Sequence, residues 1–384
     1  MSSFEEIREN RLSKLKILRE KGVNPFHVST RTDATLKEAS DTFDKLAKKK
    51  ELHLAGRIMA VRGQGGLVFA DLFDGTGKFQ ALLKKDELGD EGFALWSDTV
   101  DIGDFVEVAG TLFLTKRNEK TLQVKKWNML TKSLRPLPEK WHGLTDTEER
   151  FRRRYLDTLM NEEVRNRFVL RSRVLSTLRA LLDKAGFMEV ETSILQQLAG
   201  GANAEPFKTH HKALDIDLYL RIAPELDLKK LLIGGYPKIY EIGRSFRNEG
   251  IDVTHNPEFT TIEWYEAYSD AAKQRAFIEA LFRALVKTVK GSEILSFSGN
   301  DVDFGKPFTV LSYAEALQRY ALIPNPEKAN REELALKAAQ LGVSVAPHDT
   351  AEKIMDGMFK KAVRPKLIQP TYVISYPARM IPLA

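Results

Sequence analysis

Between residues 52 and 133, short apolar runs alternate with turn residues, a pattern that few folds other than a small β-barrel accommodate. The runs are LHLAGRIMAV, GLVFADLFDGTGKFQALL, DFVEVAGTLFLT and TLQVKKWNML. Asp74-Gly75-Thr76-Gly77 divides the second run with a hairpin-turn signal. Roughly five short strands within about 80 residues predict a Greek-key barrel such as the OB-fold. A small β-sandwich would produce a similar pattern.

The composition excludes several classes of protein. The chain has 384 residues, 43% of them hydrophobic, which is typical of a globular protein with more than one domain. No apolar run approaches the roughly 18–20 residues of a membrane helix. The first residues, MSSFEEIREN, lack the apolar segment of a secretory signal. Because there is no cysteine, disulfides and cysteine-ligated metals are excluded. We expect a cytoplasmic protein without a membrane span.

Changes in pattern divide the chain into four predicted segments. Residues 1–51 form a basic N-terminal extension with a helix, and residues 52–133 form the barrel. Residues 134–144 are a linker, since they contain Arg-Pro-Leu-Pro. Residues 145–384 mix helical and strand patterns and form an α+β domain.

Several elements of the α+β domain can be placed from local patterns. KIYEIGRSF and EFTTIEWYEAY are typical of two strands that flank an irregular loop. Asp270 is a cap for a long helix that ends at Gly291. Two more helices are predicted near residues 330–341 and 350–362.

The net charge of +6 is unevenly distributed. Residues 1–50 hold 12 basic and 8 acidic residues, and a second basic cluster follows the linker. Such asymmetry suits a polyanionic partner, whereas solvated charged helices are the alternative interpretation. The second cluster consists of Arg150, Arg152, Arg153 and Arg154.

Residues 244–268 combine charged and aromatic side chains in an unusual way for a β-hairpin. Alternation places Phe259, Glu263 and Tyr265 on one face of a strand. A carboxylate on a buried face is costly without a cation, which a ligand would supply. Arg247 and His255 could bind a phosphate while Phe259 contacts a planar heterocycle. A hairpin with surface Arg–Glu salt bridges explains the same residues equally well.

The same stretch carries a resemblance to a known family. Phe246-Arg247-Asn248-Glu249, followed by His255 and Phe259, resembles motif 2 of the class II aminoacyl-tRNA synthetases. GGANAEPF and THHKALDIDLYLRIAPEL narrow the resemblance to the lysyl-tRNA synthetases of subclass IIb. It covers nearly the whole chain and implies an OB-fold barrel followed by a class II antiparallel-sheet catalytic domain.

The resemblance implies an enzyme, a lysine–tRNA ligase. It would use ATP to convert lysine to lysyl-adenylate and transfer it to the 3′ end of tRNA(Lys). Arg247 would hold the ATP α-phosphate and the lysine carboxylate, and Glu249 would accept from the adenine amino group. His255 and Asn256 would lie near the phosphates, and Phe259 would stack on adenine. Arg247, Glu249 and His255 are therefore the expected catalytic residues.

The resemblance also assigns a pocket for L-lysine. Gly201 and Glu225 would contact the α-amino group of the substrate. Glu263 and Tyr265 would belong to the pocket for its ε-ammonium group, which agrees with the oxygen acceptors expected around a cation.

A third set of implied residues lies in the barrel. Phe69 would stack on an anticodon base, and Gln80 would read a base edge. Without the resemblance, Phe69 would be better explained as a residue of the barrel core than as an exposed residue that stacks on a base. Lys126 stands where we expect an acidic residue that helps to read the anticodon.

The sequence departs from the family pattern at several places. Motif 1, which implies a homodimer, usually ends in proline, and Ser193 stands there. Glu205 replaces a common basic residue, and Asp227 replaces an aromatic residue. Nothing in residues 250–384 resembles motif 3. We therefore expect a fragment with impaired activity, whose ligands for Mg²⁺ lie beyond residue 384; a shortened paralogue is the alternative.

Three other functions remain open at this level. An aspartyl- or asparaginyl-tRNA synthetase would share most motifs, although an aspartate site needs cations where Glu263 and Tyr265 offer acceptors. A non-catalytic RNA-binding protein would use only the N-terminal helix and the barrel. A synthetase-like enzyme that lysylates a protein would not need the barrel.

Overall fold

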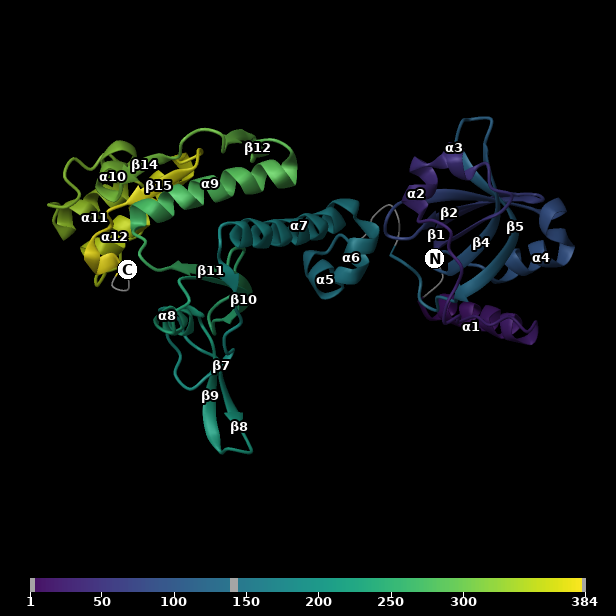
Figure 1. The fold of residues 1–384 in the computed structure, drawn as a ribbon, viewed down its shortest axis with the longest axis horizontal. Helices are drawn as coiled ribbons and strands as arrows, with labels where there is room; N and C mark the ends of the chain where they lie inside the picture. The colour runs from purple at the N-terminus through teal and green to yellow at the C-terminus, as the bar shows by residue number, and fades with distance from the viewer. Residues whose placement is uncertain (1–3, 139–143, 382–384) are drawn as a thin grey trace. The chain divides into compact units, whose positions relative to one another are not determined.

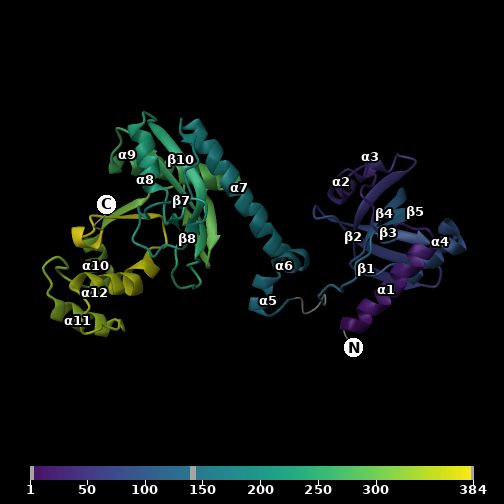
Figure 2. The same cartoon turned by 90° about the horizontal axis from the view of Figure 1, so that it is seen from below.

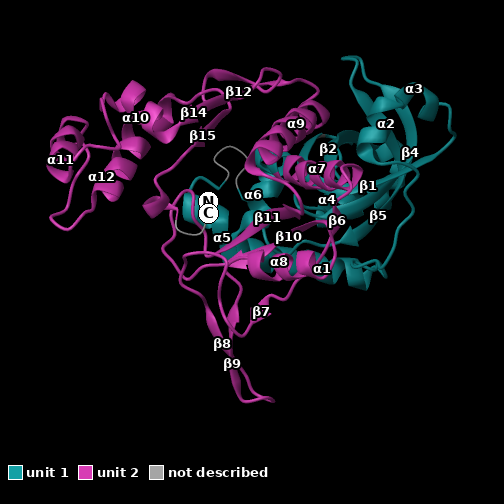
Figure 3. Ribbon diagram, turned by 60° about the vertical axis from the view of Figure 1, so that its left-hand side comes forward, with its two compact units in different colours: residues 1–167 teal, residues 168–384 magenta. Residues whose placement is uncertain are grey.

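The computed structural model describes residues 4–138 and 144–381. The chain divides into two compact units, residues 1–167 and residues 168–384 (Figure 3). Part of the predicted linker, residues 139–143, lies outside the described residues.

The first unit is built on a closed five-stranded barrel (Figure 1). Its strands are hydrogen-bonded in the order β1-β2-β3-β5-β4. They are β1 (Leu52–Gln64), β2 (Leu67–Phe73), β3 (Lys78–Lys84), β4 (Phe105–Leu114) and β5 (Lys120–Thr131). The barrel predicted from the sequence is therefore confirmed, and the sandwich alternative is wrong.

Alternating side chains fill the barrel. In β2, Val68, Ala70 and Leu72 are buried and belong to one apolar core. Between β2 and β3, the Asp74 carboxylate accepts hydrogen bonds from the backbone N–H groups of Thr76 and Gly77, which closes the predicted turn. Helix α4 (Lys85–Thr99), which no sequence pattern predicted, contributes Phe93 and Trp96 to the same core.

From residue 4 onward, where the description begins, three helices precede the barrel, and the first of them is hydrogen-bonded to the segments that flank it. Arg11 is buried and donates hydrogen bonds to the backbone oxygens of Ser133, Arg135 and Ile102. Part of the basic character of this predicted helix is therefore used within the unit. The helices are α1 (Phe4–Glu20), α2 (Leu36–Asp41) and α3 (Phe43–Leu46).

Helices α5 (Thr147–Arg152) and α6 (Arg154–Met160) follow the linker, and α7 (Glu162–Lys184) continues into the second unit. Helix α7 is followed by Gly186, which has a φ of 84° and lets the chain turn away from the helix. A short strand comes next, in which Met188 and Glu189 pair with β10 (Lys238–Phe246).

The second unit is centred on a sheet with the order β11-β10-β6. Strands β10 and β11 are antiparallel, as the fold class predicts, and they match the two predicted strands. Leu182, Phe187 and Tyr240 form the core behind this sheet. The elements are β6 (Met188–Glu189), α8 (Glu225–Ile233), β10 (Lys238–Phe246), β11 (Glu258–Glu266) and α9 (Ala271–Lys290).

A second small sheet has the order β7-β9-β8. Its strands are β7 (Leu195–Gln196), β8 (Lys208–His211) and β9 (Ile216–Leu220). Strands β8 and β9 form a ribbon that projects away from the helices of this unit (Figure 1). The sequence patterns did not predict these strands.

The remaining helices gather in one cluster around their own apolar core (Figures 1 and 2). Two of them lie where the sequence predicted helices near 330–341 and 350–362. The elements are β12 (Ile294–Phe297), β13 (Asn300–Asp303), β14 (Thr309–Ser312), α10 (Tyr313–Ala321), α11 (Arg331–Gln340), α12 (Ala351–Met358), three short helical turns at Phe359–Val363, Arg364–Lys366 and Ala378–Met380, and β15 (Thr371–Ile374). Among the described residues, no helix has the length and apolar character needed to cross a bilayer.

Candidate active site and RNA-binding surface

One face of the β10–β11 pair carries several of the predicted site residues. The register places Ser245 opposite Phe259 and Glu241 opposite Glu263. Since alternate residues of a strand share a face, Phe259, Glu263 and Tyr265 lie on one side of the pair. The alternation predicted for this strand is present in the structure.

Arg247 follows β10 directly and lies against Phe259. Its backbone N–H donates to the Pro257 oxygen at 2.8 Å, and its guanidinium carbon lies 5.1 Å from the centroid of the Phe259 ring. The Nε atom is buried and has no hydrogen-bond partner among the described residues. A buried donor without a partner is costly, so this group is suited to an anionic ligand.

The loop between the two strands is organised by its own residues. The Nδ1 atom of His255 lies 2.8 Å from Oδ2 of Asp252, and the Thr254 N–H donates to Oδ1 of Asp252. The backbone N–H of Thr254 and the ring of His255 hold the pKa of Asp252 well below its usual range. Asn256 donates to the Glu258 oxygen at 2.9 Å. The side chains of Glu249, His255 and Asn256 are exposed.

The four residues predicted for lysine lie close together. The Tyr265 hydroxyl donates to Oε2 of Glu263 at 3.2 Å. Burial raises the pKa of Glu263, and the nearby Glu225 carboxylate raises it further. Gly201 has a φ of 84°, and a Cβ there would lie 2.9 Å from the Cβ of Glu225. These residues bring two carboxylates and a phenol together. Glu225 also pairs with Lys229 at 2.6 Å, and oxygen acceptors of this kind suit a cationic ligand.

The predicted anticodon residues lie on the outside of the barrel. Phe69 is half-buried and alternates with the core residues of β2, so the interpretation of Phe69 as a core residue is wrong. Gln80 lies on β3 and uses both ends of its amide, because Nε2 donates to Glu119 at 3.1 Å and Oε1 accepts from Thr121 at 2.8 Å. Arg62, opposite Phe69, forms an ion pair with Asp71 at 2.8 Å.

Comparisons with known proteins match both regions described above, the barrel and the unit that contains the β10–β11 pair. A family described as class II tRNA synthetases (D, K and N) matches residues 146–384, and an OB-fold nucleic-acid-binding domain matches residues 52–130. A lysine–tRNA ligase of Carboxydothermus hydrogenoformans is 44% identical over 384 residues, covering 99% of this chain and 77% of the relative. The chain belongs to the lysine–tRNA ligase family. Other members are 43% identical in Lactococcus lactis subsp. cremoris (100% of this chain, 80% of the relative) and 44% identical in a Roseiflexus species (99% and 78%).

Within this family framework, Glu119 is a residue that the sequence patterns did not single out. Its carboxylate lies beside Gln80, whereas Lys126 pairs with Ala109 further along β5. The acidic side chain next to Gln80 therefore lies at position 119 and not at position 126. The parallel pairing of β3 with β5 brings Glu119 there, and no local pattern indicates that pairing.

Glu205 and Asp227, two positions expected to depart from the family pattern, hydrogen-bond to residues near the predicted site. The backbone oxygen of Glu205 accepts a hydrogen bond from the N–H of Asn248 in motif 2, at 2.8 Å. Asp227 accepts from Gln196 at 3.1 Å and forms an ion pair with Lys230 at 2.7 Å.

The four arginines of the cluster after the linker are all paired locally, with three carboxylates. Arg150 and Arg154 both contact the buried carboxylate of Asp157, at 3.1 and 2.5 Å. Arg152 pairs with Glu148 at 2.8 Å, and Arg153 pairs with Glu149 at 2.9 Å. For this cluster, the structure favours the alternative of charged helices over a polyanion site.

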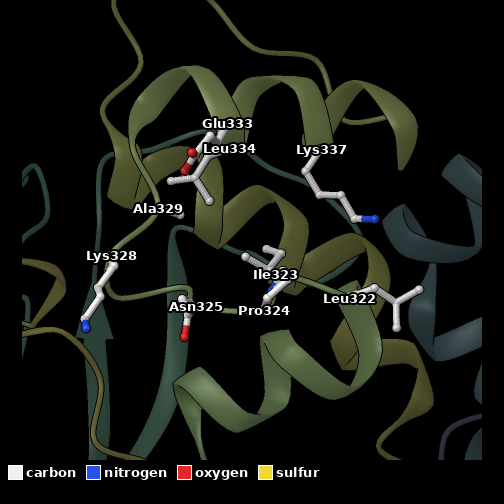
Figure 4. A pocket seen from close by; sticks show the side chains of 9 residues that line it. All are labelled: Leu322, Ile323, Pro324, Asn325, Lys328, Ala329, Glu333, Leu334 and Lys337. Carbon is white, nitrogen blue, oxygen red and sulfur yellow. The ribbon is translucent and has the colours of Figure 1, made fainter.

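A separate cavity of about 480 Å³ lies in the helical cluster (Figure 4). Ile323, Leu334, Lys328 and Lys337 are among its lining residues. None of the predicted site residues lines it.

Proposed function

We propose that this chain activates L-lysine with ATP to give lysyl-adenylate and pyrophosphate, and then transfers the lysyl group to the 3′ end of tRNA(Lys). The observation that carries the proposal is the β10–β11 face. It combines a buried, unpaired donor of Arg247, which lies beside Phe259, with the carboxylate pocket of Glu225 and Glu263. The membership of the chain in the lysine–tRNA ligase family supports the same reaction.

In the activation step, an oxygen of the lysine carboxylate attacks the α-phosphorus of ATP, and pyrophosphate leaves. Negative charge builds on the α-phosphoryl oxygens as the new P–O bond forms. The Arg247 guanidinium stabilises this charge and holds the two reactants together, without a proton transfer. Phe259 stacks on the adenine ring, and Glu249 accepts from its amino group.

Selection of lysine follows from the acceptors in the pocket. Glu263 and the Tyr265 hydroxyl face the ε-ammonium group, and Gly201 and Glu225 contact the α-amino group. His255 and Asn256 lie in the loop that covers the ATP phosphates. The family implies Mg²⁺ together with ATP, but the described residues contain no cluster of three or more acidic or histidine side chains that fits a metal ion.

We assign residues 52–133 to anticodon binding and residues 145–384 to catalysis, with residues 1–51 as a basic extension and residues 134–144 as a linker. Phe69 and Gln80 contact the anticodon of tRNA(Lys). The active form is a cytoplasmic homodimer whose subunits meet through motif 1. Exposed apolar residues of α7, Phe168 and Val169, support that interface.

Lysine-dependent exchange of pyrophosphate with ATP tests the activation step. Arg247→Ala should lower the exchange rate by about 100-fold or more, since it removes transition-state stabilisation. Arg244→Ala is the matched control, because that side chain is half-exposed and pairs with Glu258 on the surface. Exchange that depends on aspartate or asparagine instead of lysine would contradict the proposal, as would equal effects of the two substitutions.

A further inference from the structure

A buried ion pair lies beneath the proposed lysine pocket. Arg221, which directly follows β9, is 1% exposed, and Glu241 on β10 is 3% exposed. A guanidinium nitrogen of Arg221, Nη1, contacts Oε1 of Glu241. The backbone of Arg221 also bridges the two sheets, because its N–H donates to Ile194 and its oxygen accepts from Phe246, both at 2.9 Å.

The pair is held by further hydrogen bonds. Arg221 donates from Nε to the Arg244 oxygen at 2.7 Å and from Nη1 to the Thr192 hydroxyl at 3.0 Å. The Thr192 hydroxyl donates to Oε2 of Glu241 at 2.7 Å. Both carboxylate oxygens of Glu241 are therefore engaged, which is what a buried charge requires.

A glycine lets the guanidinium lie across the strand. A Cβ on Gly243 would collide with Nη2 of Arg221. Gly243 is two residues from Glu241 on the same strand, so the guanidinium reaches the face that carries the proposed site. Any side chain at this position would displace Arg221.

The ion pair lies next to Glu263. Glu241 and Glu263 are direct cross-strand partners, and like charges in that arrangement repel each other. The charged and titratable groups acting on Glu263 are Glu225 from α8, Glu241 from β10, Tyr265 from its own strand, and Arg221. Burial raises the pKa of Glu263, and Glu225 and Glu241 raise it further, whereas the hydrogen bond from Tyr265 and, to a smaller degree, the charge of Arg221 lower it.

We infer that Arg221, paired with Glu241, is a positioning residue that keeps the Glu263 carboxylate ionised for the lysine ammonium group. The inference rests on the proposed function, because it assigns Glu263 to lysine. Without Arg221, Glu241 would face Glu263 as an uncompensated carboxylate, and its repulsion would favour the protonated form of Glu263. Binding of a cation would then weaken, and the loss would be greatest at acidic pH.

Calorimetric titration of the full chain with L-lysine between pH 6 and 9 tests the inference. In Arg221→Met, we expect lysine affinity near pH 7 to fall about tenfold, because part of the Glu263 population would be protonated. As the pH is lowered, the decrease in lysine affinity should begin at a higher pH than in the unmodified chain; this decrease is called the acid limb of the pH profile. ATP affinity should change little, because Arg247 and Phe259 are retained.

Glu241→Gln provides the opposite change and does not depend on the folding of the first variant. It leaves the Arg221 cation in place and removes the neighbouring carboxylate, so the acid limb should move to lower pH. In Arg221→Met/Glu241→Gln, much of the lost lysine affinity should return. That rescue distinguishes electrostatic control of Glu263 from a merely structural role.

The outcomes separate the inference from the proposed function. A profile that does not move in Glu241→Gln, or that moves in the same direction in both single variants, overturns the role of the ion pair. An equal loss of lysine and ATP affinity in Arg221→Met, without rescue in the double variant, also overturns it. If the unmodified chain binds no lysine at any pH, the proposed function itself fails.

Discussion

Gly201 shows how the absence of a single side chain shapes the proposed lysine pocket. In Gly201→Ala, the new Cβ would lie 2.9 Å from the Cβ of Glu225 and would push that carboxylate away. We expect lysine affinity to fall about tenfold or more, because Glu225 would lose its placement. Titration with L-lysine measures this effect.

Gly291 provides the matched control for this substitution. It has a φ of 74°, close to that of Gly201, but a Cβ there meets no atom within 4 Å. Both variants should lose about 1 kcal/mol of stability from the left-handed backbone conformation. Only Gly201→Ala should lose lysine affinity, and a similar loss in Gly291→Ala would contradict the explanation.

At the level of elements, the neighbouring strands β2 and β3 each carry a phenylalanine with a different expected role. One should affect tRNA binding and the other the stability of the barrel. Phe69 lies outside the barrel core and Phe79 lies within it at 4% exposure. Phe69→Ala should weaken tRNA binding by about 1–3 kcal/mol, through loss of stacking on one base. Phe79→Ala should instead destabilise the barrel by about 3–5 kcal/mol, through the cavity it leaves.

Filter binding of tRNA and thermal unfolding, measured on both variants, test this separation. Lysine-dependent pyrophosphate exchange should be unchanged in Phe69→Ala, because that step does not involve the barrel. A loss of stability in Phe69→Ala as large as that in Phe79→Ala would show that Phe69 belongs to the core after all.

The elements that could be predicted are those whose side chains alternate or repeat locally. The barrel strands and the pair β10–β11 follow from a period of two, and α9 follows from its cap, since Asp270 accepts from the N–H of Lys273. Strands β8 and β9 could not be predicted, because β8 is exposed along its whole length and lacks an apolar pattern. They pair locally as a hairpin across a four-residue connection, so what the sequence lacked was an apolar alternation in β8 and not nearness along the chain.

The site was predictable only in part, for a related reason. Arg247 and Phe259 both belong to motif 2 and lie close together in the sequence, so their contact could be predicted. Glu119 and Gln80 are 39 residues apart, and they meet through the parallel pairing of β3 with β5. Arg221 and Glu241 meet through two different sheets. No periodicity within one segment encodes such contacts.

At the scale of the whole molecule, the proposed homodimer can be tested at α7. Phe168 and Val169 are 49% and 54% exposed. Phe168→Glu should raise the dimer dissociation constant about thirtyfold or more if this face is buried between subunits. Sedimentation velocity over a range of concentrations measures the change.

Leu336→Glu is the control for this experiment. Leu336 on α11 is 71% exposed and lies outside motif 1. Its substitution should leave the sedimentation profile unchanged. A chain that sediments as a monomer before any substitution would contradict the proposed dimer.

The local pairing of the arginine cluster has a consequence for the thermodynamics of RNA binding. Arginines already paired with Glu148, Glu149 and Asp157 hold few mobile anions and release few counterions from RNA. Lys125 and Lys126 on β5 are exposed and have no ion-pair partner in the described part of the chain. The salt dependence of tRNA affinity should therefore reflect lysines of the barrel more than the densest arginine segment of the sequence.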